Sequence, residues 1–238
     1  MNFGKNVYRH ELKYLINYGE MEVLRRRLEA VASVDSHAVN GQYMIRSLYF
    51  DDMWGNSYEE KMMGTASRKK YRIRIYNYSD TVINLERKHK EGNYIYKTVA
   101  RLTREEADAV INGDLDRIAG HPDRLVKEFY AGSRFSGMKP EVIVDYDRIP
   151  MVYEPGTVRI TFDMHLRGGF AGYDIFDPAI PVYSAMEGDA LIMEVKYTEF
   201  LPDIIRHIIA PAGSVYMAAS KYTLCCDVKR RTYDMEVI

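Results

Sequence analysis

Hydrophobic and polar residues alternate along several stretches of the chain, a pattern typical of strands that bury one face. In the segment RKKYRIRIY, residues 68–76, alternation directs Arg72 and Arg74 to one face and Ile73 and Ile75 to the other. The same pattern recurs along the chain and predicts strands at residues 8–16, 42–50, 69–76, 81–90, 94–101, 141–150, 157–167 and 190–197.

Other stretches repeat apolar residues every three or four positions, which is the period of an amphipathic helix. Residues 19–32 have this period, and Thr103 with Glu106 has the form of a capping box at the start of a second helix, which Gly113 ends. Further helices are predicted at residues 123–135, 202–209 and 217–226. Because most intervals between strands are too short for a crossover helix, we expect an antiparallel α+β fold.

Composition restricts the classes of protein and partner. The 238 residues are 47% hydrophobic and show no internal repeat or linker, so we expect one domain over residues 1–238. Lys and Arg number 33 against 34 Asp and Glu, a balance that argues against nucleic acid as a partner. The chain has no run of about 18 apolar residues and no apolar signal-peptide core, so we expect a cytoplasmic protein without a membrane segment of its own. The adjacent Cys225 and Cys226 indicate buried free thiols.

The polar faces of the predicted strands carry mainly Arg, Lys and Glu, with little of the Thr and Ser that fill solvated strand faces. A sandwich with one solvated face would also alternate, and for any single strand it stays an alternative. For the whole set we favour a closed barrel with a charged interior and an apolar exterior packed under helices. Its presumed lining contains the cations Lys13, Arg72, Arg74, Lys88, Lys97, Arg148, Arg159 and Lys196, and the carboxylates Glu11, Glu86, Asp163 and Glu194.

Such an interior requires a counter-charge. Clustered Arg and Lys side chains repel one another in low dielectric, so they persist only beside carboxylates or an anionic ligand. In the presumed lining the cations outnumber the carboxylates, and Arg forks match phosphate oxygens. The predicted ligand is therefore a phosphate polyanion.

Several motifs occur in an order that resembles one known family. RHELKY, SLYFDD, KKYRIRIY, LERKHK, VDYDRIPM, VRITFD, LIMEVKY and SKY follow one another over nearly the whole chain. This order resembles the polyphosphate polymerase domain of the vacuolar transporter chaperone (VTC) family, a branch of the CYTH-like triphosphate tunnel metalloenzymes. The resemblance implies a closed antiparallel β-barrel that forms a tunnel. It also implies transfer of the γ-phosphate of ATP to a growing inorganic polyphosphate chain, with Mn²⁺ or Mg²⁺.

The resemblance also implies roles for residues that match the family's motifs. The implied catalytic residues are Arg72, Arg74, Lys88, Arg148, Arg159 and Lys196. The implied substrate-binding residues are Lys13, Lys97, Tyr146 and Lys221. Glu11 and Glu86 complete the predicted substrate-binding set, and we interpret them as orienting counter-charges because they lie among the cations. Glu194 is the implied metal ligand, although a carboxylate there could also serve only as an ion-pair partner of an interior cation. His10, His89 and His165 have no metal-site spacing and are expected to be structural.

The first strand departs from the wider superfamily. Hydrolytic tunnel enzymes typically open with Glu-x-Glu-x-Lys, whereas this chain has Arg9, Glu11 and Lys13 at that spacing. The missing carboxylate resembles the polymerase branch and weakens the case for a two-metal hydrolase. A tunnel triphosphatase or tripolyphosphatase, and a non-catalytic polyphosphate-binding module, stay as alternatives. Eukaryotic polymerases of the family carry a membrane region that this sequence lacks, so we expect any membrane partner to be a separate protein.

Overall fold

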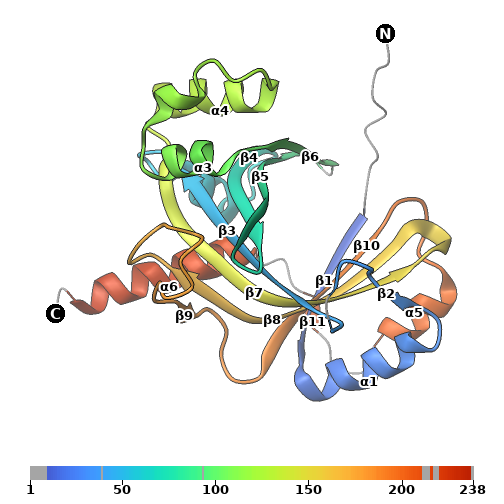
Figure 1. The fold of residues 1–238 in the computed structure, drawn as a ribbon. Coiled ribbons are helices and arrows are strands. Elements are labelled where there is room, and N and C mark those ends of the chain that lie inside the picture. Colours follow the sequence, from blue (N-terminus) through green and yellow to red (C-terminus); the bar gives the residue numbers. More distant parts are fainter. Residues whose placement is uncertain (1–9, 39, 93, 211–214, 217–219, 237–238) are drawn as a thin grey trace, which may run out of the picture. The chain divides into compact units, whose positions relative to one another are not determined.

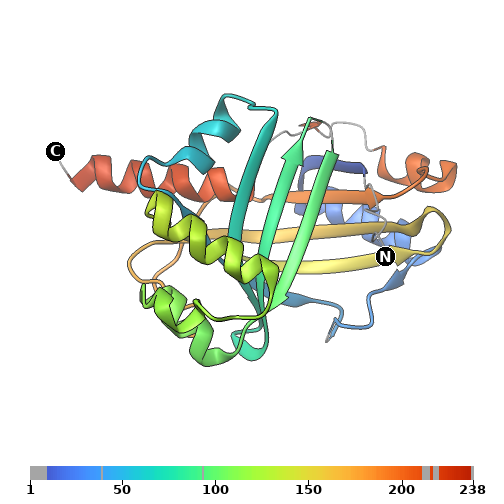
Figure 2. The same cartoon turned by 90° about the horizontal axis from the view of Figure 1, so that it is seen from above.

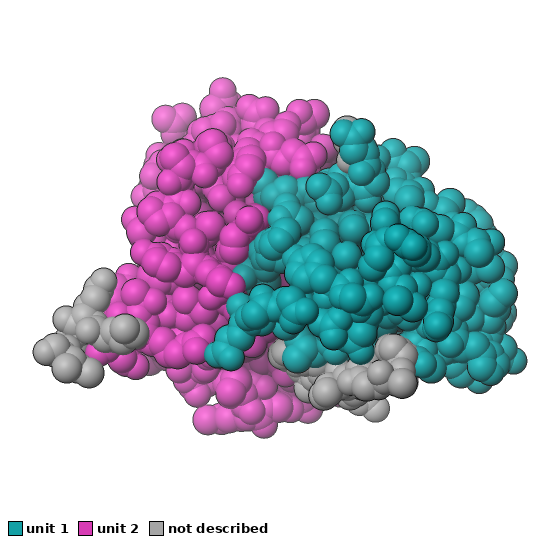
Figure 3. Space-filling view, turned by 90° about the horizontal axis from the view of Figure 1, so that it is seen from below, with its two compact units in different colours: residues 1–44, 146–166, 186–219 teal, residues 45–145, 167–185, 220–238 magenta. Residues whose placement is uncertain are grey.

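The computed structural model describes residues 10–38, 40–92, 94–210, 215–216 and 220–236, which form helices and antiparallel strands (Figures 1 and 2). The chain divides into two compact units, each built from three separated segments (Figure 3). Unit 1 comprises residues 1–44, 146–166 and 186–219, and unit 2 comprises residues 45–145, 167–185 and 220–238. The expectation of one domain over the whole chain stays a prediction.

Unit 1 contains the first strand of the chain and the strands that pair with it. In β1, β10 and β8, Lys13 lies opposite Glu194 and Glu194 lies opposite Thr161, so these side chains share one face of the sheet. The main elements are β1 (His10–Asn17), α1 (Tyr18–Glu29), β2 (Ser33–Val34), β10 (Ala190–Tyr197), α5 (Asp203–Ile209) and β11 (Val215–Tyr216). Two longer strands, β7 (Lys139–Tyr153) and β8 (Val158–Gly169), contribute residues to both units.

The other face of the unit 1 strands is apolar and packs under α1 and α5 (Figure 1). Phe162 of β8 and Met193 of β10 are fully buried in a core that also holds Leu28 of α1 and Ile205 of α5. Asn17 caps the start of helix α1, and its side chain forms a reciprocal capping box with Glu20. Burial of this apolar face fixes the strand register and therefore directs the charged parity to the opposite face.

Unit 2 repeats this division of faces. Ile73 of β4 and Leu85 of β5 are fully buried under α3 and α4, against Val126 and Phe129 (Figure 1). The strands pair in the order β3-β4-β5-β6. The elements are β3 (Tyr43–Asp51), α2 (Asn56–Met62), β4 (Ser67–Tyr76), β5 (Ser79–Glu91), β6 (Tyr94–Arg101), α3 (Arg104–Ile111), η1 (Leu115–Ile118), α4 (Arg124–Ser136), β9 (Tyr183–Ser184) and α6 (Lys221–Glu236).

The predicted α+β class and the eight main strands are confirmed, and the Thr103–Glu106 capping box opens α3 as expected. One helix was missed and another was predicted only in part. Helix α2 was missed because its sequence NSYEEKM buries only Tyr58 and has no apolar period. Helix α6 begins at Lys221 and continues to Glu236, while residues 217–219 of the predicted helix lie outside the described residues, as does Arg9 of the first strand.

The path of hydrogen-bonded strands has two ends, β11 and β6, so over the described residues the sheet is not strictly closed. The strand pairing therefore does not show the full closure that was predicted for the barrel. Along the described part of the chain, none of the helices is both long enough and apolar enough to cross a membrane. Cys225 and Cys226 are buried free thiols, as predicted.

Candidate functional site

A buried carboxylate in unit 2 gathers cations from neighbouring strands, and we call this group the Glu86 cluster. Arg72 lies opposite Glu86 in the β4–β5 register and donates from Nε to Glu86 Oε2 at 2.8 Å. Lys97 of β6 donates to Oε1 at 3.1 Å, and Arg74 lies 3.9 Å from Oε2. Tyr49 of β3 accepts from Arg72 Nη1 at 2.6 Å. The sequence pattern thus correctly predicted that Arg72, Arg74, Lys97 and Glu86 share one face.

Among the described residues, the cluster carries more positive than negative charge. Burial by itself would raise the pKa of Glu86, but Arg72, Arg74 and Lys97 outweigh burial and lower this pKa well below its usual range. Burial also lowers the pKa of Lys97, against the opposing effect of Glu86. Three cations share one ionised carboxylate, and the Lys97 side chain is 51% exposed. The cluster can therefore accept a further anion from its solvent-facing side.

Two more predicted residues belong to unit 2. Lys88 lies in register between Lys70 of β4 and Lys97 of β6, which aligns three lysines across three strands. Lys221 is the first residue of α6, directly before Tyr222. Tyr222 packs on Tyr49 with ring centroids 5.0 Å apart. Tyr49, Tyr222 and Lys70 were not among the predicted site residues. Strand alternation in YMIRSLYFD and SRKKYRIRIY could have placed Tyr49 and Lys70 on the same face as Arg72.

A second group in unit 1, the Glu194 cluster, has a carboxylate shared by three cations. Lys196 donates to Glu194 Oε2 at 2.8 Å, Lys13 lies 3.6 Å from Oε1, and Arg148 lies 3.7 Å from Oε2. Glu11 contacts both lysines, at 3.4 Å from Lys196 and 3.6 Å from Lys13. Strands β1, β10 and β7 thus bring together five residues that the sequence assigned to one charged face.

Arg148 is the most tightly held cation of this cluster. It donates from Nε and Nη2 to the two carboxylate oxygens of Asp163 at 2.6 and 2.7 Å, a bidentate geometry that fixes the guanidinium plane. Burial alone would lower the pKa of Arg148, but Asp163 outweighs it and raises this pKa. Tyr146 packs against the guanidinium, 5.3 Å from the ring centroid. Arg148 therefore acts as a fixed positive charge rather than as a mobile arm.

Arg159 lies on the same face but has different partners. It stands opposite Lys196 in the β10–β8 register. Its Nη2 atom lies 2.7 Å from Asp35 and donates to the Tyr43 hydroxyl at 2.9 Å. The Arg159 side chain is 41% exposed, so part of its guanidinium faces solvent. Asp35 lies outside the main strands, and strand alternation could not predict this pair.

Glu194 also provides the oxygen that a hard divalent cation would need. Thr161, opposite Glu194 on β8, has a buried hydroxyl with no hydrogen-bond partner among the described residues. Mg²⁺ and Mn²⁺ prefer oxygen ligands, and they can take the rest of their coordination shell from phosphate and water. In the described ranges, no three His, Cys, Asp or Glu side chains converge as a metal site. The donors fit a cation held by one carboxylate and substrate oxygens.

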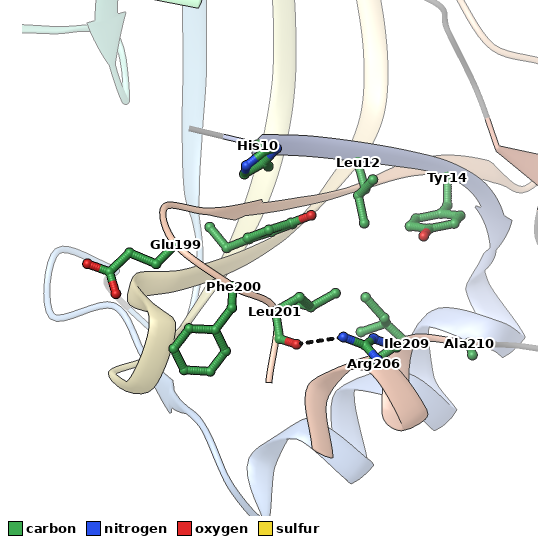
Figure 4. A pocket seen from close by; sticks show the side chains of 10 residues that line it. His10, Leu12, Tyr14, Glu199, Phe200, Leu201, Arg206, Ile209 and Ala210 are labelled. Atoms are coloured by element: carbon green, nitrogen blue, oxygen red, sulfur yellow. Dashed lines mark hydrogen bonds between the residues drawn. The ribbon is translucent and has the colours of Figure 1, made fainter. Parts of the chain in front are cut away.

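The opposite face of β1 lines a pocket of about 450 Å³ whose walls combine apolar, aromatic and charged side chains (Figure 4). His10, Leu12 and Tyr14 enter it from alternate positions of β1, and His10 stacks on Tyr197 at 4.9 Å. Lys13 has the other parity, so this pocket is separate from the Glu194 cluster. The three strand histidines have structural contacts: His89 lies 3.2 Å from Glu91, and His165 bonds both Asp147 and the Tyr18 hydroxyl at 2.9 Å.

The chain is similar to known proteins in sequence and in fold. The family model described as VTC domain matches residues 8–229. HpAC1 from Hippeastrum, named as an adenylyl cyclase and described as having a dominant triphosphatase activity, has 12% sequence identity and a TM-score of 0.55, over 93% of this chain and 96% of its own. This likeness concerns the fold, which is the triphosphate tunnel fold. No curated protein matches the sequence.

Two further solved structures have lower scores. A Pyrococcus horikoshii OT3 protein has 13% identity and a TM-score of 0.49, covering 93% of this chain and 99% of its own. A Bacillus halodurans protein named as an adenylate cyclase has 15% identity and a TM-score of 0.48, covering 79% of this chain and 80% of its own.

Proposed function

Because the chain belongs to the VTC domain family, we propose that it is an ATP-dependent polyphosphate polymerase. Its partners would be ATP and inorganic polyphosphate, with Mn²⁺ or Mg²⁺ as the cofactor and, if a membrane is involved, a separate membrane protein. The observation that carries the proposal is the Glu86 cluster, in which Arg72, Arg74 and Lys97 surround one buried carboxylate. Excess cations of this kind suit a ligand with many phosphate oxygens.

The proposed reaction is a phosphoryl transfer. An oxygen of the terminal phosphate of the chain forms a bond to the γ-phosphorus of ATP, while the bond from that phosphorus to the β-bridging oxygen breaks and ADP leaves. The attacking phosphate is already ionised, so no general base is required. The protein's contribution is then to align the reacting oxygens and to neutralise charge on the transferred group.

The two clusters offer different donors to phosphate, each within its own unit. Arg72 and Arg74 present planar guanidinium forks to phosphate oxygens, and Lys97 adds a mobile ammonium from the exposed side. In the Glu194 cluster, Lys13 and Lys196 bind phosphate, while Arg148 supplies a charge fixed by Asp163. Glu194, with the Thr161 hydroxyl beside it, would hold the divalent cation, which supplies electrostatic stabilisation of the phosphate oxygens.

Triphosphate or tripolyphosphate hydrolysis is the second candidate. The triphosphate tunnel fold and the triphosphatase activity described for HpAC1 favour it. Water would then replace the terminal phosphate of the chain as the nucleophile, and the product would be orthophosphate. With Arg9 in place of the first carboxylate of hydrolytic relatives, the sequence favours the polymerase.

One experiment separates these functions. Purified protein is incubated with ATP and Mn²⁺, polyphosphate is resolved on a urea gel, and free phosphate is assayed in the same tube. A ladder of long chains that disappears in Glu194→Ala supports the polymerase, with Lys69→Ala as the matched control because Lys69 points to the opposite strand face and contacts Glu128. Orthophosphate without a ladder would support the hydrolase. Polyphosphate binding without turnover would support a binding module.

A further inference from the structure

Lys70 is a cation of the charged face of unit 2 that the proposed mechanism leaves unused. It lies two residues before Arg72 on β4 and therefore has the same parity. In the strand register Lys70 is opposite Lys88, and Lys88 is opposite Lys97. The three lysines thus form one row across β4, β5 and β6.

The Lys70 ammonium is buried in an environment that does not neutralise it. Its Nζ atom has no hydrogen-bond partner among the described residues and lies 4.0 Å from the centroid of the Tyr222 ring. The nearby carboxylate of Asp51 already accepts bonds from the Tyr222 hydroxyl at 2.6 Å and from Ser57 N at 2.8 Å. Lys97, in the same row, differs because its Nζ atom donates a hydrogen bond to Glu86 Oε1 at 3.1 Å.

The surrounding charges agree with this geometry. Burial lowers the pKa of Lys70 to about 7, and the positive charges of Arg68 and Lys61 act in the same direction. Cys226 of α6 and Asp51 of β3 oppose this effect without cancelling it. Burial and the charge of Asp51 raise the pKa of Glu60 of α2, and the charge of Lys70 acts in the opposite direction. Near neutral pH, a substantial fraction of Lys70 therefore lacks its proton.

We propose that Lys70 is a further anion-binding residue, which takes up a proton and joins the row of Lys88 and Lys97 when a phosphate polyanion binds to the Glu86 cluster. The inference rests on the proposed binding of a phosphate chain. A polyanion beside the row stabilises the ammonium form of Lys70, and by linkage the protonation of Lys70 then strengthens binding. The flexible lysine stem lets Nζ leave the Tyr222 ring, whereas a residue packed only for stability would stay there.

The test measures proton uptake on binding of tripolyphosphate, without ATP or metal. Calorimetric titrations in two buffers of different ionisation enthalpy give the number of protons taken up at pH 8. The variant Lys70→Arg keeps a charge at all pH values and so binds without this uptake. The matched control Lys69→Met, on the opposite strand face, should behave like the wild type. Subtracting the variants removes the protonation of tripolyphosphate itself, which is common to all of them.

We expect the wild-type affinity to fall by about tenfold more than that of Lys70→Arg between pH 6.5 and pH 8.5. Equal proton uptake and equal pH dependence in both proteins would overturn the role of Lys70. If the wild type does not bind tripolyphosphate at all, this role and the proposed phosphate binding both fail. Proton-linked binding with no product from ATP would instead overturn the polymerase and leave the role of Lys70 intact.

Discussion

Arg72 and Glu86 lie directly opposite each other on β4 and β5, with Arg72 Nε 2.8 Å from Glu86 Oε2. The Glu86 side chain is only 2% exposed, and it is the carboxylate that Arg74 and Lys97 also approach. This cross-strand pair therefore contributes to the stability of unit 2. It also determines how much positive charge of the Glu86 cluster is left for an anion.

Replacing Glu86 by Gln should leave three cations close together without their counter-charge. We expect the variant to lose about 3 kcal/mol of unfolding free energy, because removing one partner of a buried ion pair leaves uncompensated charge. Urea denaturation measures the loss. Tripolyphosphate should raise the melting temperature of the variant by more than that of the wild type. Glu91→Gln, at an exposed carboxylate, should change stability by less than about 0.5 kcal/mol, and an equal loss in both variants would contradict this reading.

Glu128 of α4 should make the folded chain less stable as the pH becomes acidic. Burial alone would raise its pKa, but hydrogen bonds from Tyr71 and Arg87 outweigh burial and lower it to about 2. A carboxyl whose pKa is lower in the folded than in the unfolded chain stabilises the fold above the unfolded value and loses this effect as pH falls through the folded value. The melting temperature should therefore drop from about pH 4.5 toward pH 2, and less steeply in Glu128→Gln. Parallel curves for the two proteins would exclude Glu128 as a source of the drop.

Asp163→Asn should destabilise unit 1, because Arg148 then loses its bidentate charged partner. We expect a loss of about 3–5 kcal/mol in unfolding free energy. In the double variant Arg148→Met with Asp163→Leu, most of that stability should return because no charge is left unpaired, and polyphosphate synthesis should be lost because the Arg148 charge is gone. Chemical denaturation and the product gel together check both parts. If stability stays low in the double variant, packing around the pair matters more than its charge.

Arg74→Ala should abolish polyphosphate synthesis with little effect on folding. Arg74 donates to Ser47 at 3.0 Å but lies 3.9 Å from Glu86, so its removal leaves the Arg72–Glu86 pair in place. Loss of a guanidinium at the transferred phosphoryl group should lower the rate by at least about 100-fold. Arg101→Ala is the matched control, since Arg101 is exposed at the end of β6 and bonds only weakly to Asn84, at 3.4 Å. Unchanged synthesis by Arg74→Ala would remove Arg74 from the proposed mechanism.

Strand alternation was sufficient to predict much of the candidate site. It assigned Arg72, Arg74 and Glu86 to one face because buried Ile73 and Leu85 fix the parity of β4 and β5. A period in sequence cannot predict partners that depend on distant segments. The cover that Tyr222 provides for Lys70 comes from a helix about 150 residues farther along the chain, and Asp35 reaches Arg159 from a segment beside a two-residue strand.

The carboxylates in both clusters occupy the cations in the way that we propose for phosphate. Each of Glu86 and Glu194 offers two oxygens to three cations, much as one phosphate group of a chain would. A phosphate that binds at either cluster would share these donors with the resident carboxylate. Sharing of this kind limits the affinity of each cluster for a phosphate group.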